Sequence, residues 1–302
     1  MLQLIYLLII KIILLFTNIN GESKIKSNKP ISAPRVIPNN YFINPVNHPV
    51  KLAGTFCELR PNHFHTGIDI KSATGMEGDL IRATADGFIS RISIGPDGYG
   101  NALYIDHPNG YTTVYGHLRE FTPTLEKYIL AEQTKFQKFE VELYPPQGEF
   151  VVHQGDTIGK MGNTGASKGA HLHYEIRDTK TENPLNPLLF GLTVVDTEAP
   201  AINYVRSYNL DRDINESNAV NILVKKRGAF WVPRTNDTIL ISSNTAGFGI
   251  NTRDGMQGNW NRNGVYQINM YVDNILKYTV KMDSVSFYKT RMINAHLDYP
   301  EQ

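Results

Sequence analysis

The sequence has a single cysteine, two tryptophans and no marked excess of either charge among its 302 residues. One cysteine cannot form an internal disulfide, so covalent cross-links do not hold this fold together. The chain has 30 Lys and Arg residues against 29 Asp and Glu residues, a net charge of +1. A chain that neutralises many phosphates would carry a clear positive excess. Nucleic acid is therefore not an expected partner.

Long apolar runs are also missing, except at the amino terminus. Residues 1–16 are apolar apart from Gln3 and Lys11, and this run is shorter than the roughly 20 residues that a membrane-spanning helix needs. Such a segment is typical of a secretory signal. We expect a signal peptide over residues 1–21 and export of the protein. Membrane association is expected only if this segment is retained.

Short alternating apolar runs make up most of the remaining chain. A leader or linker rich in Lys, Ser, Asn and Pro spans residues 22–41, and strand-length runs broken by Gly, Asn and Asp then continue to residue 195. The segment His107–Gly110 predicts a hairpin turn. Helical spacing over Pro123–Phe139 indicates a helical insertion at about residues 119–150. The domain 42–195 is therefore expected to be mainly antiparallel β.

A boundary follows at residues 196–200, where charge and proline interrupt the alternation. Within the remaining domain, 196–302, alternating runs occur at residues 201–208, 219–224, 238–242 and 266–280, with a turn expected at Asp273–Asn274. Five or six such strands predict a β-sandwich-like module. Because a sandwich of about seven strands takes roughly 100 residues, we expect this module to be minimal or incomplete.

Histidines cluster in the first of these domains. Seven of the nine histidines lie between His63 and His173, and four of them form the pairs HFH (63–65) and HLH (171–173). Alternate residues of a strand share a face, so one strand can present both imidazoles of the second pair to one site. Asp69 follows His65 by four residues. Two histidines and one carboxylate meet the ligand count of a catalytic zinc site, but the spacing leaves open which member of each pair binds metal.

These residues resemble the lysostaphin and LytM-type zinc endopeptidases (metallopeptidase family 23), which cut peptides in bacterial cell-wall peptidoglycan. The matching segments, in the order of the family, are HTGID (65–69), GYGN (98–101), YGHL (115–118), GDTIG (155–159) and GNTG (162–165), followed by HLHYE (171–175). They extend over roughly residues 52–190, and it is their combination that makes the resemblance specific.

The resemblance implies that His65, Asp69 and His173 bind one Zn²⁺, and that His117 and His171 are catalytic without binding it. His63 falls outside the ligand set. The implied fold is an antiparallel sheet with a long groove, and the implied substrates are peptidoglycan stem peptides or cross-links. The implied location of the exported protein is the periplasm or cell envelope of a bacterium. Zinc-activated water would hydrolyse the peptide bond, with His171 as general base and His117 as hydrogen-bond donor to the oxyanion. No sequence feature identifies a regulatory protein.

Two other classes of function remain open. A non-catalytic cell-wall binding or hydrolase-activator module would hold peptide without cutting it, although such relatives usually lack a ligand and none is missing here. A Cys–His hydrolase would pair Cys57 with His63 or His65. Cys57 lies in an alternating, strand-like stretch, which favours a small buried packing residue.

Overall fold

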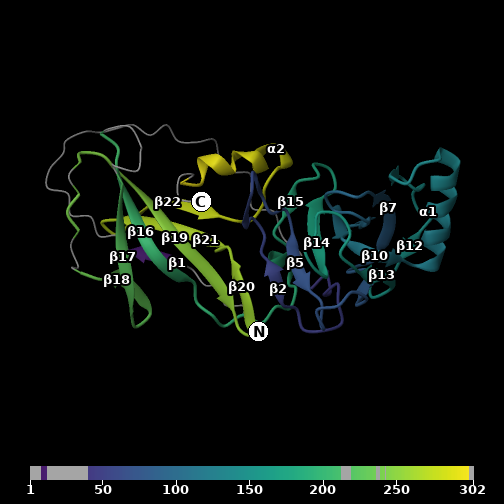
Figure 1. The fold of residues 1–302 in the computed structure, drawn as a ribbon, viewed down its shortest axis with the longest axis horizontal. Helices are drawn as coiled ribbons and strands as arrows, with labels where there is room; N and C mark the ends of the chain where they lie inside the picture. Colours follow the sequence, from purple (N-terminus) through teal and green to yellow (C-terminus); the bar gives the residue numbers. More distant parts are fainter. Residues whose placement is uncertain (1–7, 12–39, 212–218, 236–238, 242, 299–302) are drawn as a thin grey trace.

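The computed structural model describes residues 8–11, 40–211, 219–235, 239–241 and 243–298, which form two β-rich regions lying side by side (Figure 1). The predicted signal peptide and leader lie outside the described residues, except for Asn40, Tyr41 and the strand β1 (Leu8–Lys11). This strand pairs in parallel with β21 (Gln267–Val272) of the second region. Among the described residues, no helix combines the length and apolar character needed to cross a bilayer.

The first region is built around a sheet with the strand order β11-β7-β8-β9-β14-β5-β2. Its strands are β2 (Leu52–Gly54), β5 (Ile68–Lys71), β7 (Gly87–Ile94), β8 (Ala102–Asp106), β9 (Tyr111–Gly116), β11 (Val141–Leu143) and β14 (His171–Asp178), with β12 (Val151–Val152) beside β7 and β15 (Pro184–Leu185) beside β14. Neighbouring strands run antiparallel. The expected mainly antiparallel architecture is confirmed.

A smaller sheet covers the first and completes its core. It consists of β6 (Leu80–Arg82), β10 (Leu118–Phe121) and β13 (Thr157–Met161), with β13 in the middle. One apolar cluster contains Ile81 and Leu118 from this sheet together with Leu103 and Leu172 from the large one. Because apolar side chains of both sheets meet there, the central strands of the large sheet are held rigidly.

The predicted hairpin and helical insertion are both present. Strands β8 and β9 pair antiparallel across His107–Gly110, and the helix α1 spans Pro123–Phe136. Leu125 and Ile129 are its buried residues, one turn apart on the same face. The helix ends three residues earlier than expected because Gln137 takes a left-handed conformation (φ 53°). A hairpin of β3 (Leu59–Arg60) and β4 (His63–Phe64) and the 3₁₀ helix η1 (Pro187–Phe190) complete this region.

The second region is a separate sheet module. Its larger sheet has the order β18-β17-β16-β19-β20, formed by β16 (Ala201–Asn209), β17 (Ala219–Arg227), β18 (Phe230–Pro233), β19 (Ala246–Met256) and β20 (Asn259–Asn263). Strand β21 pairs with β22 (Ile275–Lys281), and the short helices α2 (Phe287–Thr290) and η3 (Arg291–Ala295) follow. The expected turn at Asp273–Asn274 is confirmed, with both residues at positive φ.

Two details of this module differ from the expectation. Residues 239–241 are not in a strand, so the predicted strand over 238–242 is wrong where the structure describes it; residues 238 and 242 lie outside the described residues. The hairpin of β19 and β20 has no counterpart in the sequence prediction. Glycine, asparagine and charged residues dominate residues 246–263, so apolar alternation does not reveal these strands.

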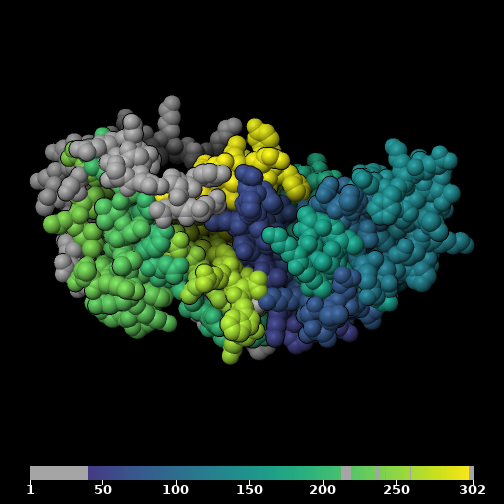
Figure 2. All heavy atoms as spheres, viewed as in Figure 1, coloured from purple at the N-terminus to yellow at the C-terminus, as the bar shows by residue number. Residues whose placement is uncertain are grey.

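The module packs directly against the first region. Figure 2 shows the yellow segment of α2 and η3 and the lime segment of β19 and β20 in contact with the blue residues at the start of the first region. In particular, β20 lies beside β2 and η3 lies beside β4. Backbone bonds such as that from Asn186 N to Asp283 O, 2.8 Å, join the two regions further along.

Candidate metal centre

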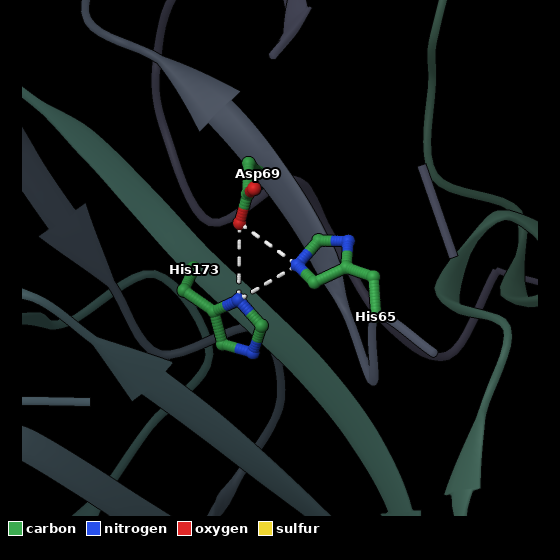
Figure 3. A group of neighbouring side chains, drawn as sticks. All are labelled: His65, Asp69 and His173. Carbon is green, nitrogen blue, oxygen red and sulfur yellow. Dashed lines mark hydrogen bonds and ion pairs between the residues drawn. The ribbon is translucent and has the colours of Figure 1, made fainter. Parts of the chain in front are cut away.

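Three donor atoms from His65, Asp69 and His173 converge on one point (Figure 3). His65 Nε2 lies 3.1 Å from His173 Nδ1 and 3.1 Å from Asp69 Oδ1. His173 Nδ1 lies 3.0 Å from the same Asp69 oxygen. All three residues are buried. The donors therefore form a nearly equilateral triangle inside the first region.

The strand ladder explains how two of these residues meet. Asp69 of β5 and His173 of β14 are direct partners in the antiparallel ladder, so their side chains share one face of the sheet. His65 approaches from the loop before β5 through Gly67. A Cβ atom at Gly67 would lie 2.5 Å from the Tyr174 carbonyl oxygen and 2.9 Å from His173 Nε2. Only glycine allows the chain to pass this close to β14.

Each of the three ligands makes a hydrogen bond through the atom that faces away from the triangle. The atom that faces the triangle therefore keeps a lone pair for a metal ion. His65 Nδ1 lies 2.8 Å from the Thr55 carbonyl, to which it must donate. His173 Nε2 lies 2.8 Å from Glu175 Oε1 and donates in the same way. Arg60 Nη2 donates to Asp69 Oδ2 at 2.7 Å, so Oδ1 of that carboxylate faces the centre. Such outer contacts set the tautomer and direction of metal ligands.

The residues present fit a zinc ion. Two imidazole nitrogens without hydrogens and a carboxylate oxygen, about 3 Å apart, would repel one another unless a cation or proton lies among them. A tetrahedral zinc ion with bonds of roughly 2.0–2.1 Å separates its ligand atoms by about 3.3 Å, close to the triangle observed. Imidazole and carboxylate donors also suit zinc. Three protein ligands would leave the fourth position of a tetrahedral zinc ion for water or substrate.

The electrostatics of the centre favour a positive charge. Burial by itself raises the pKa of Asp69, but the adjacent His65 and His173 hold it well below its ordinary value. Burial lowers the pKa of His173, yet its hydrogen bonds with Asp69 and Glu175 raise it to about 9. The two carboxylates thus stabilise positive charge between them, and a metal cation would take the place of that proton.

A buried charged network stands behind His173. The carboxylate of Glu175 accepts hydrogen bonds from Thr66 Oγ1 at 2.5 Å, Tyr99 Oη at 2.6 Å, His173 Nε2 at 2.8 Å and Arg177 Nε at 2.6 Å. Burial raises the pKa of Glu175, but Arg177 and His173 hold it far below its ordinary value. The sequence prediction gave Glu175 and Tyr99 no role. Alternation along β14, with residues 173, 175 and 177 on one face, is the signal that indicates this network.

His171 lies at the edge of the same centre. Its Nδ1 lies 2.8 Å from the Gly169 carbonyl, to which it donates, and its Nε2 lies 3.6 Å from Asp69 Oδ1. As the spacing predicts, His171 and His173 project from one face of β14 while Leu172 is fully buried. The free Nε2 of His171 is therefore a proton acceptor near the metal-facing oxygen.

His117 lies beside His171, with their ring centroids 4.7 Å apart. Its Nδ1 lies 2.8 Å from the Thr164 carbonyl, to which it donates. Burial lowers the pKa of His117 to about 4, together with the neighbouring charges of His173 and His171. His117 is thus neutral, and its Nε2 also accepts. All five residues of the predicted site are brought together.

The remaining candidates lie elsewhere. His63 is exposed, and its Nδ1 lies 2.9 Å from the Pro61 carbonyl, outside the donor triangle. Cys57 is 6% exposed, and burial raises the pKa of its thiol to about 12. A neutral buried thiol is not an activated nucleophile, so the structure argues against the Cys–His hydrolase alternative.

The comparisons with known proteins agree with this geometry. The family model described as Peptidase family M23 matches residues 63–134 and 137–187. The DD-carboxypeptidase/endopeptidase Mpg of Neisseria meningitidis is 34% identical over 155 residues, which are 51% of this chain and 26% of that protein. The murein hydrolase activator NlpD of Escherichia coli is 33% identical over 123 residues, 40% of this chain and 25% of that protein.

Among solved structures, the catalytic domain of lysostaphin from Staphylococcus simulans is 20% identical, with a TM-score of 0.35, over 47% of this chain and 91% of that one. This chain spans about a quarter of the length of the curated relatives named above. The matched residues include all three donors of the triangle. The segment of residues 63–187 is therefore a domain of peptidase family M23, and its His65–Asp69–His173 site is intact.

Proposed function

We propose that this protein is a zinc-dependent endopeptidase that hydrolyses peptide bonds in the stem peptides or cross-links of bacterial peptidoglycan. The observation that carries the proposal is the convergence of three buried metal-facing donors with the free Nε2 atoms of His117 and His171. The relative named as a DD-carboxypeptidase/endopeptidase adds support for the substrate class. A cell-envelope location follows from such a substrate.

In this mechanism His65, Asp69 and His173 hold the metal. When bound, zinc supplies a Lewis acid that polarises the scissile carbonyl and makes hydroxide available near neutral pH. His171 acts as general base, because its Nδ1 hydrogen is committed to Gly169 and only Nε2 faces the centre. The charged network around Glu175 keeps His173 in one orientation throughout.

The role of His117 depends on a proton. Its Nδ1 hydrogen is committed to Thr164, so Nε2 can donate to an oxyanion only after it has been protonated. We assign His117 as the hydrogen-bond partner of the developing oxyanion: Nε2 takes up a proton from solvent as negative charge grows beside it, because that charge raises the proton affinity of the imidazole. Replacement by Gln, which retains an N–H donor, is then expected to preserve more activity than replacement by Ala. Equal losses in the two variants would argue against a donor role.

The test compares release of fragments from purified sacculi with zinc content. His173→Ala is expected to lose both zinc and hydrolysis, whereas His171→Ala retains zinc and loses roughly 10²–10⁴ in rate. His153→Ala is the matched control, since the His153 side chain is 76% exposed and lies outside the site. Full activity after the metal has been chelated and removed would overturn the zinc mechanism. Mass spectrometry of the fragments identifies the bond cleaved.

A non-catalytic hydrolase activator is the second candidate, favoured by the similarity to NlpD. It predicts a zinc-to-protein ratio near zero and no fragments released by this protein alone. It also predicts faster sacculus digestion when the protein is added to a purified murein hydrolase. The donor set favours the peptidase, and these three measurements separate the two functions.

The proposal includes the domain limits expected from the sequence: a signal peptide over 1–21, a leader over 22–41, a peptidase domain over 42–195 and a C-terminal domain over 196–302. Observations that support the division are the end of η1 at Phe190 and the start of β16 at Ala201. Determining the amino-terminal residue of the protein recovered from the envelope tests the cleavage. Retention of Met1 would point to membrane association instead.

A further inference from the structure

The loop that follows β2 carries the group that orients His65. The Thr55 carbonyl accepts from His65 Nδ1 at 2.8 Å and from Glu58 N at 3.2 Å. The same turn holds the backbone of His65, through bonds from Cys57 N to His65 O at 2.8 Å and from His65 N to Glu58 O at 2.9 Å. Any shift of Thr55 therefore moves the imidazole with it.

His65 needs this support more than the other two ligands do. Asp69 and His173 lie opposite each other in the ladder of β5 and β14, so the sheet itself holds them in place. His65 lies outside the strands, between β4 and β5. Its position is decided by what holds the turn at residues 55–58.

The C-terminal module holds that turn. Asn261 Nδ2 of β20 donates to the Ala53 carbonyl at 2.7 Å. Gly264 N donates to Thr55 Oγ1 at 3.1 Å, and the same hydroxyl lies 3.4 Å from the Gly264 carbonyl, to which it donates. Thr55 thus uses its carbonyl for the metal ligand and its side chain for the module.

The module also contacts the residues around both histidine ligands. The guanidinium carbon of Arg177, the partner of Glu175, lies 4.7 Å from the centroid of the Phe287 ring in α2, within the range of a cation–π contact. Phe64, the residue before His65, lies with its ring centroid 5.7 Å from that of His296. Figure 2 shows this yellow segment lying over the blue residues of the first region.

We propose that the C-terminal module stabilises the metal centre. Strand β20 holds Thr55 in place, Thr55 orients His65, and the affinity of the site for zinc is raised as a result. The inference rests on the proposed function, because it concerns a ligand of the zinc site. Thr55, Asn261 and Gly264 are positioning residues, since none of them faces the donor triangle. The module therefore contributes to metal retention by the peptidase.

The decisive variant is Thr55→Val in the full 302-residue chain. Valine matches the shape of threonine and retains the backbone carbonyl, but it removes the hydroxyl that bonds to Gly264. The zinc dissociation constant, measured by competition with a chromophoric chelator, is expected to rise about tenfold, at the lower end of the effect of outer contacts to metal ligands. Thr55→Ser, which keeps the hydroxyl, is expected to bind zinc like the wild type.

Two further variants change β20, the strand of the C-terminal module that contacts the chain just before the turn at residues 55–58. Asn261→Ala removes the contact with Ala53 and is expected to weaken zinc binding several-fold. Trp260→Ala changes the adjacent residue, whose side chain is 96% exposed, and is expected to leave zinc binding unchanged. The ¹⁵N chemical shifts of the His65 ring report its tautomer directly, and Thr55→Val is expected to disturb them in the metal-free protein.

The outcomes separate this inference from the proposed function. A wild-type protein that binds no zinc refutes the proposed function. A wild type that binds zinc, with Thr55→Val and Asn261→Ala binding equally tightly and the His65 ring shifts unchanged, refutes the positioning role alone. If Thr55→Val does not fold, Asn261→Ala and its Trp260→Ala control decide the question.

Discussion

The two regions of this protein bury their strands to very different extents. In β14, which carries His171 and His173, seven of eight residues are buried, whereas only one of nine is buried in β17 of the C-terminal module. Apolar side chains such as Leu223 and Phe230 of the module are exposed. The chemistry is thus located in the region where strands are covered on both faces.

This difference shows what each region can do. Glu175 and Arg177 are nearly inaccessible to solvent. The attraction between their opposite charges offsets the cost of desolvation only if rigid strands keep the two side chains paired. The C-terminal module has a less deeply buried charged pair, Arg206 and Asp298, whose side chains are 8% and 27% exposed. It contacts the first region through β20 and α2. Its effect on the site is therefore on the position of the ligand His65.

The largest expected effect comes from breaking the buried network. Glu175→Gln leaves the Arg177 guanidinium buried without its carboxylate, which is expected to cost about 3–5 kcal/mol in the free energy of unfolding. The loss of the contact to His173 is expected to weaken zinc binding roughly 10- to 100-fold. Urea unfolding and zinc competition measure the two effects.

The matched control for this variant is Glu182→Gln. The side chain of Glu182 is 69% exposed and lies 3.9 Å from Arg177 Nη1. An exposed ion pair contributes under about 1 kcal/mol, so this variant is expected to unfold like the wild type. If both variants lose the same stability, burial does not distinguish the two partners of Arg177.

Leucine truncation compares the cores of the two regions directly. Leu103 in β8 is fully buried, and Leu103→Ala is expected to lower the free energy of unfolding by about 2–5 kcal/mol, because a cavity remains. Leu223 in β17 is 52% exposed, and Leu223→Ala is expected to change it by less than about 0.5 kcal/mol. Urea titrations provide both values. A large loss at Leu223 would contradict the contrast drawn between the regions.

Removal of the metal is expected to destabilise the first region selectively. Zinc at about 100 times its dissociation constant stabilises the folded protein by roughly 2.7 kcal/mol, so chelation lowers the melting temperature of the wild type. The His173→Ala variant, which lacks a ligand, should melt at the same temperature with and without chelator. A chelator effect of equal size in that variant would place the metal elsewhere.

A pH dependence is expected within the module. Burial raises the pKa of Asp254 from 3.8 to about 7, with Asp196 and Glu198 adding to the rise, and its buried Oδ1 has no hydrogen-bond partner. A raised pKa means that stability is fully present below pH 3.8 and is lost as the pH rises through about 7. Asp254→Asn stays neutral, so it is expected to melt above the wild type at pH 8 and close to it at pH 4. A constant difference across this range would exclude titration of Asp254.

Local patterns explain which elements were predictable. The turn residues at 107–110 and 273–274 and the helical spacing after Pro123 act over a few residues, and all three elements are present. The hairpin of β19 and β20 was not predictable in this way. Polar residues dominate its sequence, and its strands are held by pairing with distant segments such as β16.

The sequence by itself determined the chemical types of the donors and the strand periodicity that places His171 and His173 on one face. It could not determine which ring nitrogen of His65 and His117 faces the site, because that depends on the carbonyl groups of Thr55 and Thr164, which come from other segments. Nor could it reveal the bond between Thr55 and Gly264, which are 209 residues apart. Side-chain alternation is a local property of the backbone, whereas hydrogen bonds between remote segments form only when the two regions pack together.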